Sequence, residues 1–132
     1  MKLKIGDTFS NSRLVTDELI RDFAALSGDY NPIHLDEEYA KTTRFGQRIA
    51  HGMLSGAFVS AVLGSEFTET KTLYLSQSMR FTAPVFIGDT ITTTATITRI
   101  REEKGIVSIE TVCRKDDGEI TLKGEAVVMI LP

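Results

Sequence analysis

Apolar and polar residues alternate along the second half of the chain, which is typical of half-buried β-strands. The alternation predicts four strands, over residues 72–82, 89–101, 106–114 and 119–131. Turn residues separate these strands: Pro84 with Gly88-Asp89, Lys104-Gly105, and Asp117-Gly118. Because one face of the strands is polar, we expect an antiparallel sheet that is covered on one side.

The expected strand faces follow from the period of two. In residues 72–82 the apolar face consists of Leu73, Leu75, Met79 and Phe81. In residues 89–101 the apolar face consists of Ile91, Ala95 and Ile97, and five threonines at positions 90, 92, 94, 96 and 98 form the other face. The two later strands alternate in the same way, so all four strands are expected to cover one core.

The first half of the chain carries the helical signals. Thr16 can cap a helix whose first turn holds Asp17 and Glu18, where the helix dipole favours negative charge. Apolar residues follow at helical spacing: Leu19, Ile20, Phe23, Ala24 and Leu26. Gly28 ends this helix in the usual C-terminal position, and a short second helix is expected over residues 36–41.

Residues 52–64 form a different kind of segment, with no charged residue and many small ones. A helix without a charged face is expected to be buried. Helices before strands indicate an α+β fold, in which an antiparallel sheet wraps around this buried helix. That layout is the hot-dog fold, with one domain over residues 1–132. A sheet of this size has exposed edges, which need a partner or protecting charges, and a homodimer paired edge to edge would remove one of them.

Composition excludes several classes of protein. The 132 residues carry a net charge of −3 without a basic cluster, which argues against nucleic-acid binding. The sequence has no run of about 18 apolar residues, so no membrane-spanning helix is predicted, and residues 1–7 lack the apolar core of a signal peptide. The single Cys113 fits a reducing cytoplasm. Two histidines and one cysteine are too few for a zinc site of the usual Cys/His type, whereas a carboxylate-rich metal site stays open, although no residue pattern points to one.

The segment Gly28-Asp29-Tyr30-Asn31-Pro32-Ile33-His34 places a carboxylate and an imidazole on a short turn that a proline stiffens. Groups held in this way can hydrogen-bond to one water molecule and transfer its protons, as hydration of a small organic substrate requires. The same residue types are also common in ordinary turns. From the residues alone, both interpretations stay open for Asp29 and His34.

His51-Gly52 stands where the expected buried helix begins. The N–H groups of a first helical turn have no partner inside the helix, so the Gly52 N–H can stabilise a developing oxyanion. An ordinary helix start is the alternative, and for His51 we expect an orienting or packing role. Ser55 and Ser60 lie inside the helix, outside any strand–serine–helix elbow, so neither is expected to be a nucleophile.

Four basic residues could face an anionic cofactor, although most exposed basic residues do not: Lys41, Arg44, Arg48 and Arg80.

Taken together, these residues resemble the MaoC-like dehydratases, specifically the (R)-specific enoyl-CoA hydratases. The hydratase motif of that family corresponds to Phe23, Leu26, Ser27, Gly28, Asp29, Asn31, Pro32, Ile33, His34 and Ala40. The family's His-Gly pair corresponds to His51-Gly52. The similarity continues through residues 74–78, 84–89 and 124–126, and therefore covers nearly the whole chain.

The resemblance implies reversible hydration of a trans-2-enoyl-CoA to the (R)-3-hydroxyacyl-CoA. It implies that Asp29 is the general base and that His34 shares the water, with the donor of the proton to C2 left open. The Gly52 N–H would hold the thioester oxygen, Asn31 would support the loop, and Ser60 would lie near the site. No metal or redox cofactor is implied, the acyl-CoA is the partner molecule, and family members are homodimers.

Three alternatives remain from the sequence. A hot-dog thioesterase usually has a carboxylate in the central helix, but the first one here is Glu66, beyond the expected helix end. A non-catalytic acyl-CoA-binding protein usually lacks the Asp/His pair. A 3-hydroxyacyl-[acyl-carrier-protein] dehydratase performs the same chemistry on another carrier. The length of the acyl chain is expected to depend on the central helix and on residues 66–71.

Overall fold

The computed structural model describes residues 2–66 and 71–132. Within these residues one antiparallel sheet contains six strands, in the order β1-β4-β5-β6-β2, and β3 pairs with β6. The strands are β1 (Thr8–Leu14), β2 (Thr72–Gln77), β3 (Arg80–Phe81), β4 (Thr90–Arg101), β5 (Ile106–Arg114) and β6 (Ile120–Ile130). The helices are α1 (Asp17–Ser27), α2 (Pro32–Leu35), α3 (Glu37–Lys41) and α4 (Gly52–Ala61), which continues as the π-helical turn η1 (Val62–Glu66).

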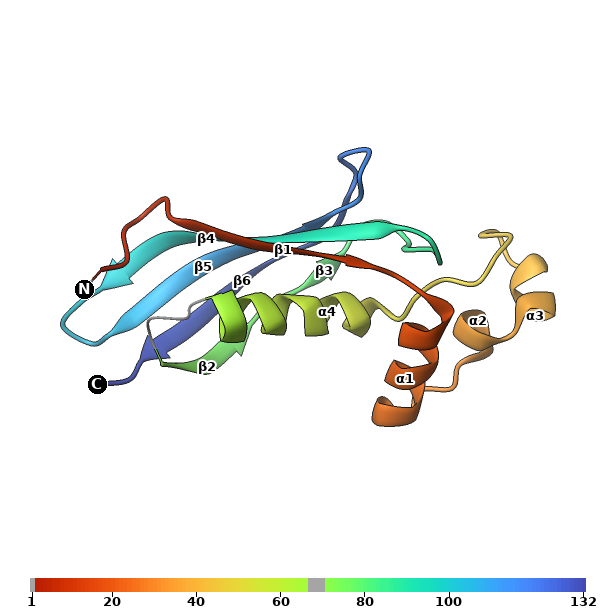
Figure 1. Cartoon of the computed structure of the whole chain (residues 1–132), viewed down its shortest axis with the longest axis horizontal. Coiled ribbons are helices and arrows are strands. Elements are labelled where there is room, and N and C mark those ends of the chain that lie inside the picture. The colour runs from red at the N-terminus through yellow and green to blue at the C-terminus, as the bar shows by residue number, and fades with distance from the viewer. Residues whose placement is uncertain (1, 67–70) are drawn as a thin grey trace.

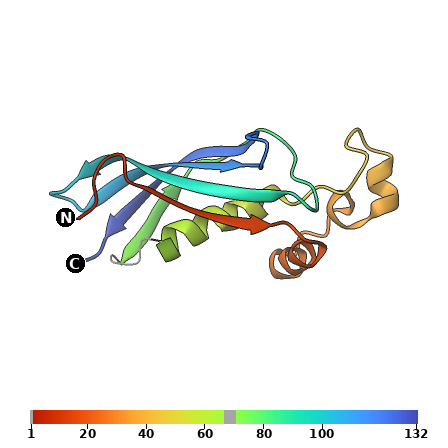
Figure 2. The same ribbon diagram turned by 45° about the horizontal axis from the view of Figure 1, so that its top comes forward.

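The sheet runs over α4, which lies along one of its faces (Figures 1 and 2). Buried residues of α4 share one core with the inward-facing residues of β4, β5 and β6: Leu54, Phe58, Val59, Ile91, Ala95, Val107, Ile109, Leu122 and Val128. Burial of this apolar surface is the main force that holds the helix to the sheet. An antiparallel sheet around a central helix is the hot-dog fold, as the alternation in the sequence predicts.

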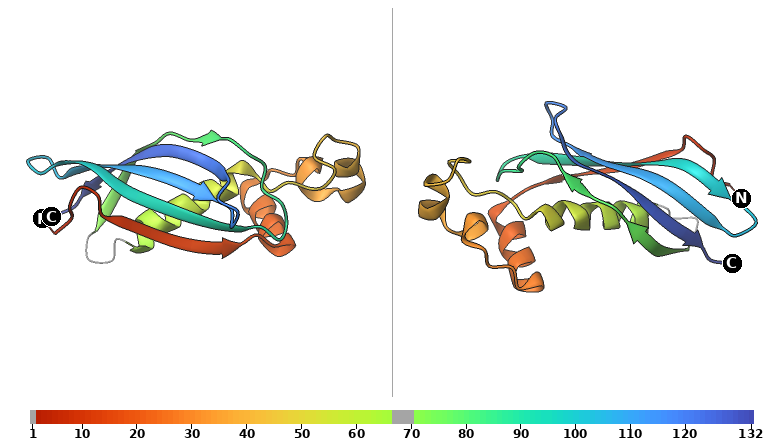
Figure 3. Two further views of the ribbon diagram at one scale, coloured as in Figure 1. Left: turned by 90° about the horizontal axis from the view of Figure 1, so that it is seen from above. Right: turned by 180° about the vertical axis from the view of Figure 1, so that it is seen from behind.

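Helices α1, α2 and α3 gather beyond one end of the sheet, at the end where α4 begins (Figure 3). The first helix has the predicted limits: the Thr16 hydroxyl accepts a hydrogen bond from the Leu19 N–H, and Gly28 adopts the left-handed conformation at φ 80°. The helix predicted over residues 36–41 is α3, and Asp36 caps it. The Ile49 N–H donates a hydrogen bond to the Ile33 carbonyl, which holds the segment from Gly28 to His34 close to the start of α4.

The strand predictions are confirmed for β4, β5 and β6 but are wrong in the first part of the sheet. Strand β1 is absent from the prediction because its sequence is mostly polar and most of its residues are exposed. It pairs with β4 along one edge of the sheet and contributes little to the core. An edge strand of this kind has no apolar alternation for a sequence pattern to detect.

The strand predicted over residues 72–82 is two strands, β2 and β3. A register shift between Tyr74 and Ser76 changes which side chains face the core. Leu73 and Leu75, predicted to be buried, are 49% and 45% exposed, and β2 lies at the edge of the sheet. The main chain between the two strands presses on β6, where a Cβ atom on Gly124 would lie 1.8 Å from the Ser78 carbonyl oxygen. Only glycine permits this approach.

The prediction that the central helix is fully buried is also wrong for one of its faces. Met53 is 51% exposed, and Ala57 and Ser60 are exposed as well. The sheet of a single chain covers only the opposite side of α4. The helical path also runs two residues beyond the predicted end at Gly64, because η1 extends it to Glu66.

Candidate active site

The turn between α1 and α2 fixes the position of Asp29. The Ser27 hydroxyl accepts a hydrogen bond from the Asp29 N–H at 3.1 Å. The Asn31 side chain accepts one from the Ile33 N–H at 3.2 Å and so caps α2, whose first residue is Pro32. The seven-residue motif therefore forms a helix end, a turn and a new helix start, which leaves the chain little freedom.

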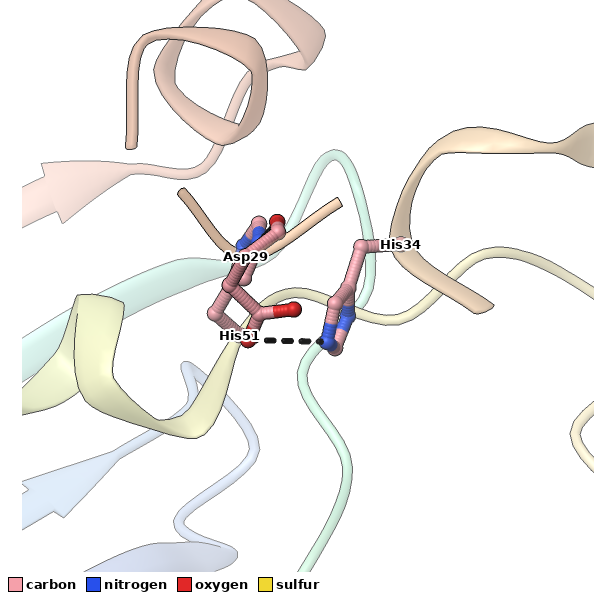
Figure 4. Close-up of side chains that lie close together, drawn as sticks. All are labelled: Asp29, His34 and His51. Carbon is pink, nitrogen blue, oxygen red and sulfur yellow. Dashed lines mark hydrogen bonds and ion pairs between the residues drawn. The ribbon is translucent and has the colours of Figure 1, made fainter. Parts of the chain in front are cut away.

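The two oxygens of the Asp29 carboxylate have different surroundings. Oδ1 accepts a hydrogen bond from the Asn31 N–H at 3.2 Å, which anchors the side chain to its own turn. Oδ2 lies 4.0 Å from Nε2 of His34 (Figure 4). The Asp29 side chain is half-exposed and the His34 side chain is 10% exposed. One carboxylate oxygen is thus structural, and the other faces the imidazole.

The hydrogen bond of His34 with the main chain fixes its tautomer. Its Nδ1 lies 2.8 Å from the Ile49 carbonyl oxygen, and since a carbonyl only accepts, Nδ1 carries the hydrogen. Burial lowers the pKa of His34 below its usual 6.5, although the bond to Ile49 and the charge of Asp29 act in the opposite direction. At neutral pH the ring is therefore uncharged, and Nε2 presents a lone pair to Asp29.

Two acceptors cannot form a hydrogen bond with each other, and their separation of 4.0 Å is suited to a bridging water. A water about 2.8 Å from both atoms can donate one hydrogen to each of them. Its oxygen lone pairs then point away from the pair. The arrangement can hold a water molecule as a nucleophile and can accept its proton.

The carboxylate borders a cavity of about 460 Å³ at the N-terminus of α4, whose other lining residues include His51, Gly52, Ser55, Phe81 and Thr82. The Gly52 N–H lies in the first turn and has no acceptor among the residues that the structure describes. The Phe81 ring covers Gly52, since a Cβ atom there would lie 3.0 Å from it. The cavity thus offers a free donor close to the Asp/His pair.

The serines that the sequence singled out lie at different depths along α4. Ser55 is buried and lines the cavity. Ser60 is exposed, eight residues after Gly52, and is not part of the cavity lining among the described residues. Eight residues of α-helix span roughly 12 Å. The structure therefore does not bring Ser60 to the Asp29 carboxylate.

The basic residues also separate. Arg44 lines the cavity and lies over the Phe45 ring. Arg48 is instead buried, and its guanidinium donates to the His34 carbonyl and to Asp17 on α1, each at 2.7 Å. Arg48 supports the site from within the protein and does not face a ligand. No signal in the sequence distinguished it from Arg44, because both are arginines in one loop.

Asp29, His34 and His51 could be considered as metal ligands, because one ligand atom from each lies within 4.8 Å of the others. The histidine rings, however, are stacked, with centroids 3.9 Å apart and an angle of 28° between their planes. A metal ion lies close to the plane of each imidazole that binds it, and two stacked rings cannot meet that condition together. This group of residues does not fit a metal ion.

Comparison with known proteins identifies the family. Residues 4–117 match the family model described as "MaoC like domain". The chain belongs to the MaoC-like domain family. It is 45% identical over 128 residues to an (R)-specific enoyl-CoA hydratase of Rhodospirillum rubrum, covering 97% of this chain and 88% of that protein.

Two further relatives extend the comparison. The solved structure of the (R)-hydratase from A. caviae involved in PHA biosynthesis has a TM-score of 0.94 at 39% identity, covering 99% of this chain and 98% of that one. A mitochondrial 3-hydroxyacyl-[acyl-carrier-protein] dehydratase of Arabidopsis thaliana is 35% identical over 131 residues, covering 97% of this chain and 78% of that protein. Within residues 2–66 and 71–132, no helix has the length and apolar character needed to cross a membrane.

Proposed function

We propose that this protein is an (R)-specific enoyl-CoA hydratase, which adds water reversibly to a trans-2-enoyl-CoA. The observation that supports this most directly is the 4.0 Å separation of Asp29 Oδ2 and His34 Nε2 beside the free N–H of Gly52. These three groups are what hydration of an enoyl thioester needs: two acceptors for a water and one donor for the carbonyl oxygen. The similarity to the Rhodospirillum rubrum hydratase points to the same reaction.

In the forward reaction the water oxygen bonds to C3 while Asp29 accepts one of its protons. The electron pair of the C2=C3 bond moves into the thioester as an enolate, whose oxygen the Gly52 N–H stabilises. The accepted proton is then returned to C2 on the same face of the substrate. His34 keeps the water in place through Nε2, because its Nδ1–H is held by Ile49.

Asn31 and Ser60 have different roles in this proposal. The side-chain oxygen of Asn31 accepts the Ile33 N–H, so Asn31 supports the loop and does not contact substrate. Ser60 lies on the open face of α4, roughly 12 Å along the helix from Gly52. There it would contact the acyl chain beyond the reacting carbons. The predicted contribution of residues 66–71 to chain length falls largely on residues 67–70, which lie outside the described residues.

We further propose that the protein acts as a homodimer. An uncharged face of α4 is open to solvent, and β2 is an edge strand with exposed apolar side chains: Leu73, Tyr74 and Leu75. A second copy that covers both features would bury this surface. The buried free thiol of Cys113 is consistent with work in a reducing cytoplasm.

A second candidate function is dehydration of a 3-hydroxyacyl group on acyl carrier protein, which the Arabidopsis relative favours. The chemistry at C2 and C3 is the same, and only the carrier differs. A thioesterase is disfavoured because α4 carries no carboxylate, and the first one on the helical path, Glu66 at the end of η1, comes 14 residues after Gly52.

Hydration of crotonyl-CoA by the purified protein tests the proposal. Loss of the conjugated enoyl-thioester absorbance without free thiol, and an (R) alcohol on chiral analysis, are the expected results. Release of CoA would instead indicate a thioesterase. Turnover of crotonyl-[acyl carrier protein] with none of crotonyl-CoA would assign the second candidate function.

A further inference from the structure

His51 lies between the two halves of the proposed site. It is the N-cap residue of α4, immediately before Gly52, but its side chain makes no capping hydrogen bond. The imidazole is instead 2% exposed and lies against Asp29 and His34, as Figure 4 shows. His51 therefore contacts both members of the Asp/His pair, and its main chain is bonded directly to the Gly52 N–H.

The contacts of the ring define what it does. Nε2 lies 2.9 Å from the Asp29 carbonyl oxygen, so it carries the hydrogen and donates to that carbonyl. The ring stacks on His34 with a centroid distance of 3.9 Å. Phe23 of α1 lies on the ring as well, with centroids 4.9 Å apart. A hydrogen bond thus joins His51 to Asp29, 22 residues earlier in the sequence, and two ring contacts join it to His34 and Phe23.

Packing alone does not explain an imidazole at this position. With Nε2 protonated, Nδ1 of the neutral ring is an acceptor, and it is buried without a hydrogen-bond partner among the described residues. An unpaired buried acceptor destabilises the folded protein, and a phenylalanine would fill the space without one. The feature that requires histidine is therefore the Nε2–H donated to the Asp29 carbonyl.

We propose that His51 is a positioning residue, which sets the distance between the Asp/His pair and the Gly52 N–H. This inference rests on the proposed hydratase function. Attack at C3 and stabilisation of the thioester oxygen must occur on one bound substrate. The water and the Gly52 N–H must therefore keep a fixed separation. The hydrogen bond from His51 holds the Asp29 main chain at that separation from α4.

The side-chain amides of glutamine and asparagine provide a matched test. The amide nitrogen of glutamine reaches approximately where Nε2 of histidine lies, whereas that of asparagine reaches only the position of Nδ1. We therefore compare His51→Gln, His51→Asn and His51→Phe, the last of which keeps a ring without a donor. The readouts are kcat and KM for crotonyl-CoA, with folding checked by circular dichroism and thermal melting.

The expected result is a fall in kcat of about 100-fold for His51→Phe and His51→Asn, the scale of a 1 Å misplacement. KM should stay within about threefold, because the affected interaction acts on the transition state. His51→Gln should recover at least about tenfold of the lost kcat. If His51→Phe does not fold, the comparison of kcat between His51→Gln and His51→Asn tests the inference.

Equal kcat values for His51→Gln and His51→Asn would overturn the inference, and so would a His51→Phe enzyme as active as the unaltered protein. Either result leaves the proposed function in place as long as the unaltered protein hydrates crotonyl-CoA. Absence of hydration by the unaltered protein would contradict the proposed function, and with it the role of His51.

Discussion

The guanidinium of Arg48 donates a hydrogen bond from Nε to the main-chain carbonyl of His34 at 2.7 Å. The same side chain, which is 8% exposed, reaches Asp17 at the start of α1. Hydrogen bonds from Arg48 and Arg21 lower the pKa of Asp17, so its carboxylate stays charged. A buried arginine thus links α1 to the turn that carries the imidazole. His51 and Arg48 hold the carbonyls of Asp29 and His34 respectively.

Removal of Arg48 is expected to destabilise the fold. Arg48→Met leaves the His34 carbonyl and Asp17 without this donor, which costs about 1–3 kcal/mol for hydrogen bonds to a charged group. Arg48→Lys should recover only part of the loss, since an ammonium cannot serve both acceptors in fork geometry. Chemical denaturation of the two variants measures the free energies of unfolding. Values within about 0.5 kcal/mol of the unaltered protein would show that the link is not structural.

A double-mutant cycle with Asp17→Asn separates the two bonds of Arg48. Because Asp17 is half-exposed, its pair with Arg48 is expected to contribute no more than about 1 kcal/mol of coupling. The remainder of the Arg48→Met effect then belongs to the His34 carbonyl. Coupling that equals the whole effect would instead assign the stabilisation to the ion pair.

The pKa of His34 predicts how stability depends on pH. Burial lowers the pKa of His34 below 6.5 in the folded protein, so the unfolded chain binds the His34 proton more tightly than the folded chain does. Protonation of His34 should therefore leave the free energy of unfolding unchanged well above pH 6.5 and reduce it as pH drops through and below that value. Comparison of the unaltered protein with a variant at position 34 isolates this effect, because the titration of all groups that the two proteins share cancels.

His34→Asn is the matched variant, because its amide can still donate to the Ile49 carbonyl but does not titrate. The stability of the unaltered protein relative to His34→Asn should decrease as pH falls from about 7 to 5. Denaturant unfolding at several pH values measures this difference. A difference that is constant, or that grows toward low pH, would contradict the pKa shift.

Gly124 is expected to tolerate no side chain. A Cβ atom there would lie 1.8 Å from the Ser78 carbonyl oxygen, and a main-chain atom between two strands cannot move away easily. Gly124→Ala should destabilise the protein by about 1–3 kcal/mol, the scale of overpacking. Gly64→Ala is the control, since nothing lies within 4 Å of its Cβ position, and it should cause no loss. Equal thermal midpoints for the two variants would contradict this view of β6.

Much of the fold is predictable because it rests on patterns that span many residues. The alternation in β4, β5 and β6, and the caps at Thr16 and Gly28, follow from burial and hydrogen bonding that the chain encodes locally. Strand β1 lacks such a pattern because it is an exposed edge. The division of β2 from β3 goes with a close main-chain approach of Ser78 to Gly124, and the alternation of residues 72–82 does not indicate which glycine the chain will meet.

The candidate site was partly predictable for the same reason. Asp29 lies on the turn between α1 and α2, and His34 follows five residues later in the short helix α2, so the spacing alone predicts that the two side chains are near one another. The roles of Arg48 and His51 depend on main-chain carbonyls 14 and 22 residues away in sequence. Any residue has a carbonyl, so a sequence pattern cannot show which one an arginine or histidine will reach. The sequence does not indicate the open face of α4, because the absence of charges does not reveal whether a helix is covered by its own sheet or by a second copy.

The most direct test of the central claim is the rate of crotonyl-CoA hydration by Asp29→Asn, His34→Asn and the double variant. Each single substitution should lower kcat by about 10²–10⁴-fold, the contribution of a positioned acid or base. Because the two groups hold one water, the double variant should be no more than about tenfold slower than the slower single variant. A single variant within about tenfold of the unaltered protein, or losses that multiply in the double variant, would contradict the claim that Asp29 and His34 act together on one water.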